Sequence, residues 1–190
     1  MVFVVDIECL RGPDSEFVVK ELAICNLKTS QIEVYHLLPP YPEYYLQKQT
    51  RKTNSWISNN IHGIAWDDGY IGYDQLTNIL QKAVDQEASL EPIYAKGVEK
   101  SDFILSVLDR PNLVINLDNV GCPKPRDLFY TSENPFTCFV HTGNSDHCAL
   151  LKCAKFAAWM HIRTFLTPFL PKQISTSAAA TVAAAAVNPA

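Results

Sequence analysis

The sequence predicts an α/β fold built on one mixed sheet, and three observations carry that prediction. Strand-like apolar runs follow one another without a helix in the first 38 residues, as in an antiparallel meander. Helical periodicities then alternate with short apolar runs, as they do where helices connect strands. Hydrophobic residues make up 47% of the 190 residues and charged residues only 19%, which is the composition of a chain that builds a core.

Three strands are expected at the start of the chain, over Val2–Ile7, Phe17–Leu27 and Gln31–Leu38. The first is a continuous apolar run that ends in acidic residues, which is typical of a buried strand. The third alternates apolar and polar side chains. Turn-forming residues at 12–15 separate the first two strands, and Pro39 follows the third. These strands are predicted to pair antiparallel.

Helices and strands then alternate. Helical spacing of apolar residues predicts helices over Tyr73–Val84, Lys100–Leu108 and His147–Leu166, and the last of these has the most extensive apolar side. Short apolar runs predict strands over Pro92–Ala95 and Leu113–Leu117. The intervening segment 122–145 is rich in Pro, Asn, Thr and Ser and is predicted to be a loop.

The length corresponds to one domain, which we place at residues 1–172. Residues 173–190 are rich in alanine and have no amphipathic face, so we expect a disordered tail there.

The net charge of −4 gives no overall electrostatic footprint for a polyanion, so any contact with nucleic acid depends on local cations or metal ions. No run of about 18 apolar residues is present, which predicts no membrane-spanning helix. The first residues lack the basic start and long apolar run of a signal peptide. An intracellular location, cytoplasmic or nuclear, is expected, with the six cysteines as thiols or metal ligands.

Asp6 and Glu8 are the first candidate functional residues. Their i, i+2 spacing places both carboxylates on one face of the predicted strand. Two adjacent carboxylates repel each other unless a cation lies between them. Their oxygens suit Mg²⁺ or Mn²⁺, and two such ions can promote phosphodiester hydrolysis. A solvated strand end is the alternative interpretation.

Four segments, taken in order, resemble the DnaQ-like 3′–5′ exonucleases. They are the Asp-x-Glu pair on the first strand, Ile61-His62-Gly63-Ile64, Ile93-Tyr94-Ala95-Lys96-Gly97 with the helix after it, and His147-Cys148-Ala149-Leu150. The resemblance extends over residues 2–166. It implies an RNase H-like fold of the DnaQ exonuclease type, with three layers and a mixed central sheet.

The same resemblance implies an active set of four acidic residues and one histidine. Asp6 and Glu8 match the first two acids. Alignment on the second motif places Ser101 at the third acid, and a slip of one residue at the helix start would bring Asp102 there instead. Asp102 is equally well explained as an acidic residue favoured in the first turn of a helix.

The third motif, His-x4-Asp, fits the sequence in two registers. His141 with Asp146 satisfies the spacing literally, although Asp146 can also serve as the N-cap of the last helix. His147 with Lys152 fits the start of that helix better, but it replaces the metal-binding acid with a lysine. The second register is preferred, and it makes two-metal hydrolysis doubtful.

Cys138-x2-His141-x6-Cys148 is a second candidate site, because thiolates and imidazole favour Zn²⁺. Glu8 is the favoured fourth ligand, with Asp146, His147 and Cys122 as alternatives. Ordinary buried cysteines near a polar histidine would give the same pattern.

The order of Glu8, Cys138, His141 and Cys148 also resembles the Glu-Cys-His-Cys set of the Maelstrom domain, a DnaQ-like fold without the exonuclease acids. This second resemblance implies binding of single-stranded RNA.

Three functions remain open. The preferred one is a degenerate exonuclease that binds single-stranded RNA or DNA and holds a structural Zn²⁺ through Glu8, Cys138, His141 and Cys148. The alternative is an active exonuclease that uses Mg²⁺ or Mn²⁺. In that case, by family resemblance, the metal ligands are Asp6, Glu8, Asp102 and Asp146, and His141 is the general base. The third is a protein-interaction scaffold. The sequence leaves the oligomeric state undetermined.

Overall fold

The computed structural model of the protein describes residues 2–85, 92–108, 114–128 and 147–166. The predicted tail at 173–190 lies outside these ranges. So do three of the candidate site residues, Cys138, His141 and Asp146.

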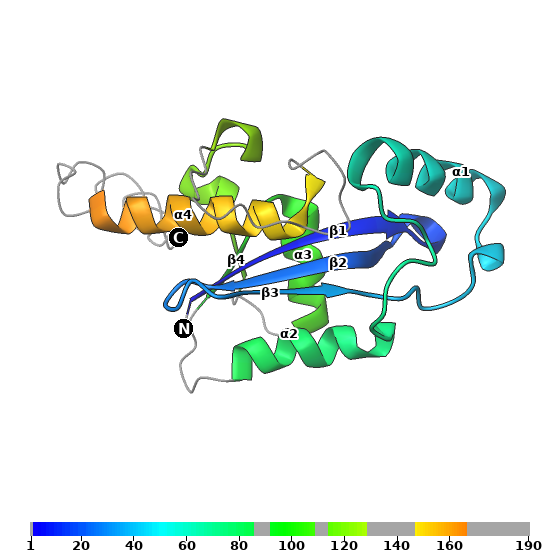
Figure 1. Cartoon of the computed structure of the whole chain (residues 1–190), viewed down its shortest axis with the longest axis horizontal. Coiled ribbons are helices and arrows are strands. Elements are labelled where there is room, and N and C mark those ends of the chain that lie inside the picture. The colour runs from blue at the N-terminus through cyan, green and yellow to red at the C-terminus, as the bar shows by residue number, and fades with distance from the viewer. Residues whose placement is uncertain (1, 86–91, 109–113, 129–146, 167–190) are drawn as a thin grey trace, which may run out of the picture.

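A five-stranded mixed sheet forms the centre of the molecule (Figure 1). The strands are β1 (Phe3–Arg11), β2 (Phe17–Asn26), β3 (Ile32–His36), β4 (Ile93–Ala95) and β5 (Val114–Asn116). Their order is β3-β2-β1-β4-β5, with antiparallel pairing among the first three strands and parallel pairing from β1 to β4 and from β4 to β5. The predicted α/β class with a mixed central sheet is therefore confirmed.

Helices cover both faces of the sheet and complete the three layers. They are α1 (Lys48–Ile57), α2 (Leu76–Asp85), α3 (Val98–Leu108) and α4 (Ala149–Leu166). Helix α4 packs on one face, and α2 lies on the opposite face (Figure 1). Short helical turns occupy Pro13–Ser15, Glu43–Tyr45, Ser58–His62, Tyr73–Gln75, Leu117–Val120 and Pro125–Asp127. No helix within the described ranges is long and apolar enough to cross a membrane.

The alternation of side chains along β1 directs the two acidic residues toward α4. Phe3, Val5 and Ile7 enter the core shared with α2 and α3, whereas Val4 packs in the core beneath α4. Because successive residues of a strand face opposite sides, Asp6 and Glu8 share the face of Val4. The apolar strand therefore fixes where the acidic side chains lie.

A β-bulge follows Glu8 at once. Glu8 pairs with Glu21 of β2, but the next residue, Cys9, pairs with Val19, so Lys20 is the extra residue in β2. The ammonium of Lys20 is fully buried and donates to the carbonyls of Leu37, Trp66 and Asp68, each at 2.7 Å. Lys20 thus ties the segment after the His62 turn to the sheet.

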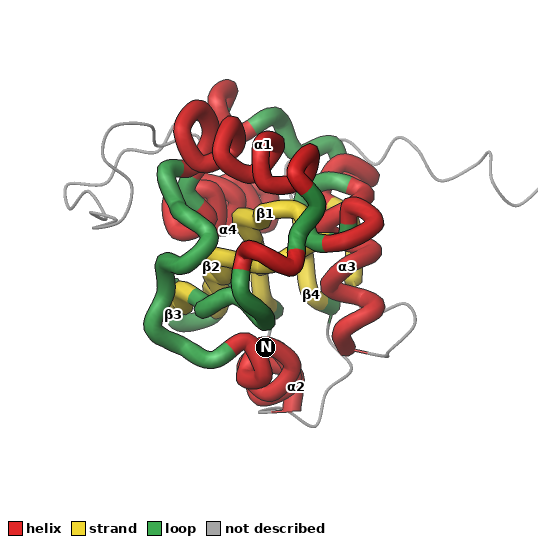
Figure 2. The backbone as a smooth tube through the Cα atoms, turned by 90° about the vertical axis from the view of Figure 1, so that its right-hand side faces the viewer, coloured by secondary structure: helices red, strands yellow, loops and turns green. Residues whose placement is uncertain are grey.

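The sequence patterns predict no helix at α1, because the contact that holds this helix against the sheet is polar. The buried Asn54 accepts a hydrogen bond from the Arg11 amide at 2.7 Å and donates to the Arg11 carbonyl at 2.8 Å. An apolar stripe is the usual signal for such a helix, and α1 has none. The paired bonds hold α1 at the carboxyl end of β1. Figure 2 shows α1 beside β1.

Candidate functional site

Asp6 and Glu8 lie buried between β1 and α4, where they are 1% and 7% exposed. Burial of two carboxylates is costly unless each has a charged or hydrogen-bonding partner. The structure supplies these partners from two helices that are distant in sequence.

Lys152 reaches down from the first turn of α4 to both carboxylates. Its Nζ lies 2.8 Å from Oδ2 of Asp6 and also pairs with Oε1 of Glu8. Lys100, from the first turn of α3, places its Nζ 2.9 Å from Oδ1 of Asp6. Asp6, Glu8, Lys100 and Lys152 form what we call the charged centre.

The charges in this centre balance, with two carboxylates facing two ammonium groups. Burial by itself would lower the pKa of Lys152, but the carboxylates of Asp6 and Glu8 outweigh burial and raise it above its ordinary value. Lys152 is therefore cationic at neutral pH. Burial raises the pKa of Glu8, against the lowering influence of Lys152 and Lys100.

The second-motif positions lie on α3. Ser101 is buried and its hydroxyl donates to the Gly97 carbonyl at 2.8 Å. Asp102, the alternative acid, is exposed, while Lys100, two residues earlier, is the α3 residue that contacts Asp6. The structure therefore brings a lysine of α3, and not Asp102, to the carboxylates of β1.

The third-motif position in the His147 register is occupied by Lys152. Among the described residues, this donor set does not fit a pair of divalent ions, because it offers two carboxylates and both already have ammonium partners. Within the part of the chain that the structure describes, no three or more His, Cys, Asp or Glu side chains are arranged to hold a metal ion.

Cys148 and Glu8, the two described members of the zinc set, have different partners. The Cys148 thiol is fully buried and donates to Oε1 of Glu21 at 3.8 Å. The other oxygen of Glu21 accepts the Ala149 amide at 2.8 Å, at the first residue of α4. The Nε2 atom of His36 lies 3.5 Å from Oε1 of Glu21. Cys138 and His141 lie outside the described residues, so the full zinc set stays a prediction.

Sequence reasoning missed Glu21, which faces Glu8 across the strand pair and binds a free amide at the start of α4. A signal was available, because Lys20-Glu21 is a charged pair within an otherwise apolar strand. Charged residues are almost never fully buried without partners. Such a pair therefore indicates that each of the two charged side chains has a polar partner in the fold.

His62 fixes the Ile61–Ile64 segment to the end of β1. It is buried, and its Nδ1 accepts the Ile64 amide at 3.1 Å. Nε2 then carries the proton and faces the Cys9 carbonyl at 3.3 Å. Gly63, at φ +75°, closes the turn in the left-handed region that glycine adopts at little cost. His62 thus connects the turn to Cys9, the residue that follows Glu8 on β1.

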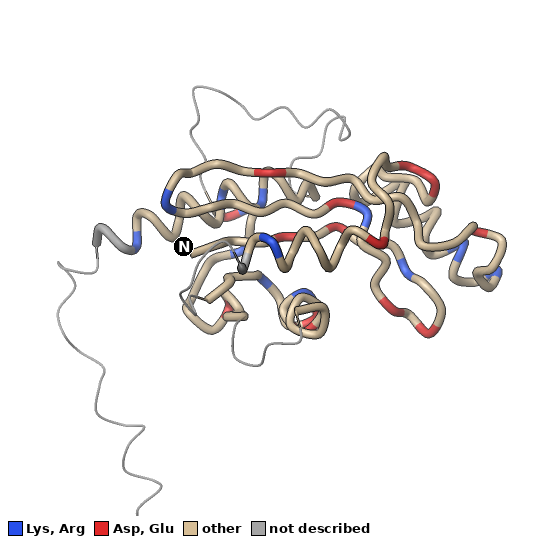
Figure 3. The backbone as a smooth tube through the Cα atoms, turned by 90° about the horizontal axis from the view of Figure 1, so that it is seen from below, with Lys and Arg blue, Asp and Glu red and all other residues tan. Residues whose placement is uncertain are grey.

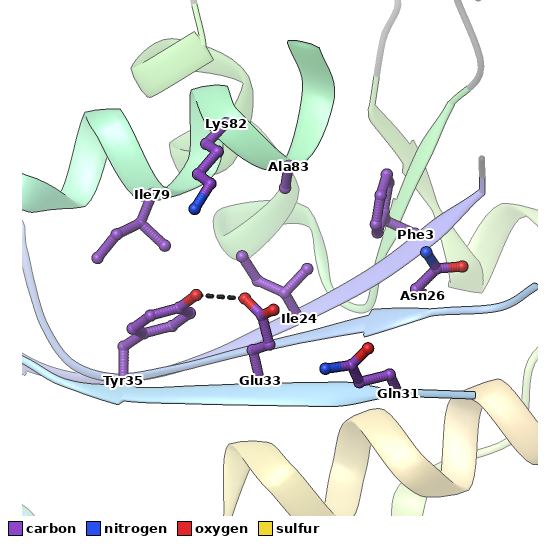
Figure 4. Close-up of a pocket in the computed structure, with 9 residues that line it drawn as sticks. All are labelled: Phe3, Ile24, Asn26, Gln31, Glu33, Tyr35, Ile79, Lys82 and Ala83. Carbon is purple, nitrogen blue, oxygen red and sulfur yellow. Dashed lines mark hydrogen bonds between the residues drawn. The ribbon is translucent and has the colours of Figure 1, made fainter. Parts of the chain in front are cut away.

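A small cavity of about 80 Å³ lies on the other face of the sheet, between β2, β3 and α2 (Figure 4). Glu33 and Tyr35 are hydrogen-bonded in its wall, and Lys82 of α2 overhangs it. The cavity belongs to the face opposite Asp6 and Glu8, so it is separate from the charged centre.

Comparison with models of protein families gives no match, and no curated protein matches the sequence.

Two solved structures resemble the chain over most of its length. One, described as "3′-end specific recognition of histone mRNA stem-loop by 3′-exonuclease", is 12% identical, with a TM-score of 0.48 over 86% of this chain and 81% of that one. The other is a full-length 3′-exonuclease, 15% identical, with a TM-score of 0.44 over 88% of this chain and 82% of that one. At these identities the similarity concerns the fold alone.

Proposed function

We propose that this chain is an exonuclease-type fold that binds single-stranded RNA or DNA without hydrolysing it. The position of Lys152, between the carboxylates of Asp6 and Glu8, is the observation that carries the proposal. In the His147 register, an ammonium group takes the third-motif position, where the exonuclease set has the last of its four acidic residues.

The chemical consequence follows from what an ammonium can and cannot do. Metal-assisted hydrolysis needs an ion that polarises a phosphoryl oxygen and generates hydroxide near neutral pH. A lysine ammonium neutralises charge, but it has no open coordination positions and cannot activate a water as a Lewis acid. Lys152 and Lys100 supply the charge balance of a metal cluster without its reactivity.

The first prediction concerns hydrolysis. With 5′-labelled single strands and either Mg²⁺ or Mn²⁺, we expect no 3′ shortening above that of an Asp6→Asn variant. Gel analysis of the labelled products is the measurement. Divalent-dependent shortening that Asp6→Asn abolishes would overturn the proposal. It would support the active alternative with Asp6, Glu8, Asp102, His141 and Asp146.

The zinc proposal needs its own measurement. A zinc ion on Glu8, Cys138, His141 and Cys148 would have to displace Lys152 from Glu8 and Glu21 from Cys148. If the site exists, elemental analysis of protein purified without chelator should give about one zinc per chain. The content should fall in Cys138→Ser and remain in Cys153→Ser, which changes a core cysteine of α4. Zinc-free folded protein would contradict the site.

A further inference from the structure

Six exposed side chains gather on and just before α1, at the end of the molecule where β1 ends. We call this group the α1 surface: Tyr44, Tyr45, Lys48, Arg51, Lys52 and Trp56. The three rings are the unusual part, with Tyr44, Tyr45 and Trp56 exposed by 70%, 67% and 58%. Exposure of a large ring leaves considerable apolar area in water, which a stacking partner would cover.

The charge on this surface is opposite to that of the whole chain. Three cations and no Asp or Glu lie between Tyr44 and His62, with Glu43 the nearest acidic residue before them, whereas the chain carries −4. Lys and Arg positions mark α1 at the right-hand end of Figure 3. Lys48, Lys52 and Trp56 follow one another at intervals of four residues, so they line one side of the helix.

Two of the rings come just before the helix that carries these cations, and the third lies within it. Tyr44 and Tyr45 lie with their ring centroids 4.6 Å apart at an interplanar angle of 35°. Trp56 stands on the same helix one turn beyond Lys52. Exposed rings on either side of a group of cations suit a single strand, because phosphates pair with the cations and bases stack on the rings.

From this arrangement we infer that the α1 surface is where single-stranded RNA or DNA binds. The inference rests on the proposed function and supplies its surface. The Asn54 bonds to Arg11 hold α1 at the carboxyl end of β1, the same end toward which Glu8 lies. An anionic lipid surface fits less well, because α1 offers Trp56 and Ile57 but no continuous apolar face to insert.

The test measures binding by the full chain to a labelled 20-nucleotide single strand, by fluorescence anisotropy at several salt concentrations. The triple variant Lys48→Gln, Arg51→Gln, Lys52→Gln should weaken binding by about tenfold or more and flatten the salt slope by about 2, at roughly 0.7 per lost phosphate contact. Trp56→Ala should weaken binding by about fivefold or more at every salt concentration, because stacking is lost.

The matched control removes three exposed lysines elsewhere, as Lys28→Gln, Lys82→Gln, Lys124→Gln. Both triple variants lose the same charge, and the control should bind like the wild type. Wild-type binding that the α1 triple variant retains would overturn this inference and leave the proposed function standing. Failure of the wild type to bind any strand at 50 mM salt would overturn both. Binding only to anionic phospholipid vesicles would overturn both as well.

Discussion

Replacing Lys152 with methionine should lower the free energy of unfolding by about 3–5 kcal/mol, the usual cost of removing one partner from a buried ion pair. Methionine fills a similar volume, so the loss reports charge and not packing. Asp6 and Glu8 would then face each other across a buried space with only Lys100 to balance them. Urea denaturation followed by circular dichroism measures the change.

Two further variants serve as a control and as a test of metal binding. Lys82→Met removes an exposed lysine and should change the free energy of unfolding by no more than about 0.5 kcal/mol. Lys152→Asp would place a third carboxylate beside Asp6 and Glu8, so Mn²⁺ should stabilise that variant by mass action and leave the wild type unchanged. Lys152→Met that unfolds like the wild type would show that this lysine does not hold the carboxylates.

Lys20→Met should be the second large loss, about 2–4 kcal/mol at pH 7.5. The variant leaves the carbonyls of Leu37, Trp66 and Asp68 without their shared donor, and each unsatisfied buried group costs about 1–3 kcal/mol. Methionine also avoids the cost of burying the ammonium of Lys20. The expected loss is therefore smaller than the summed cost of the three unsatisfied carbonyls. The exposed Lys28→Met is the matched control.

The Lys20 variant should also change how stability depends on pH. Burial lowers the pKa of Lys20 from 10.5 to about 8, so the folded chain binds this proton less tightly than the unfolded chain does. Between pH 8 and 10.5 the unfolded state holds more protons, and the contribution of Lys20 to the free energy of unfolding rises with pH. The difference between wild type and Lys20→Met should therefore be larger at pH 9.5 than at pH 7.5. A constant difference would contradict the burial of a lysine at this position.

The elements that bury apolar side chains could be predicted from the sequence. All five strands, and the helices α2, α3 and α4, lie within a few residues of their expected positions, because their cores impose a regular spacing. β1 is longer than expected, extending to Arg11, since its pairing with β2 continues beyond Ile7 and Glu8 through the buried Leu10.

The polar contacts could not be predicted in the same way. Asn54, which anchors α1, and Lys20, which occupies the bulge, are buried polar residues that no hydrophobic period marks. At the charged centre, the carboxylates of Asp6 and Glu8 were correctly placed on one face. The residues that meet them come from α3 and α4, and which side chain of a helix reaches a distant strand depends on tertiary packing.

The ion pair between Glu8 and Lys152 has a consequence for the synthesis of the chain. At a synthesis rate of about 5–20 residues per second, Lys152 is added to the chain roughly 7–30 s after Glu8. Until α4 emerges and docks, the first strands hold their carboxylates without Lys152, and the apolar face around Val4 and Ala23 lies uncovered. A nascent chain stopped before α4 would therefore expose both buried carboxylates and an apolar, aggregation-prone sheet face. A chaperone that binds the chain through this interval would raise the yield of folded protein.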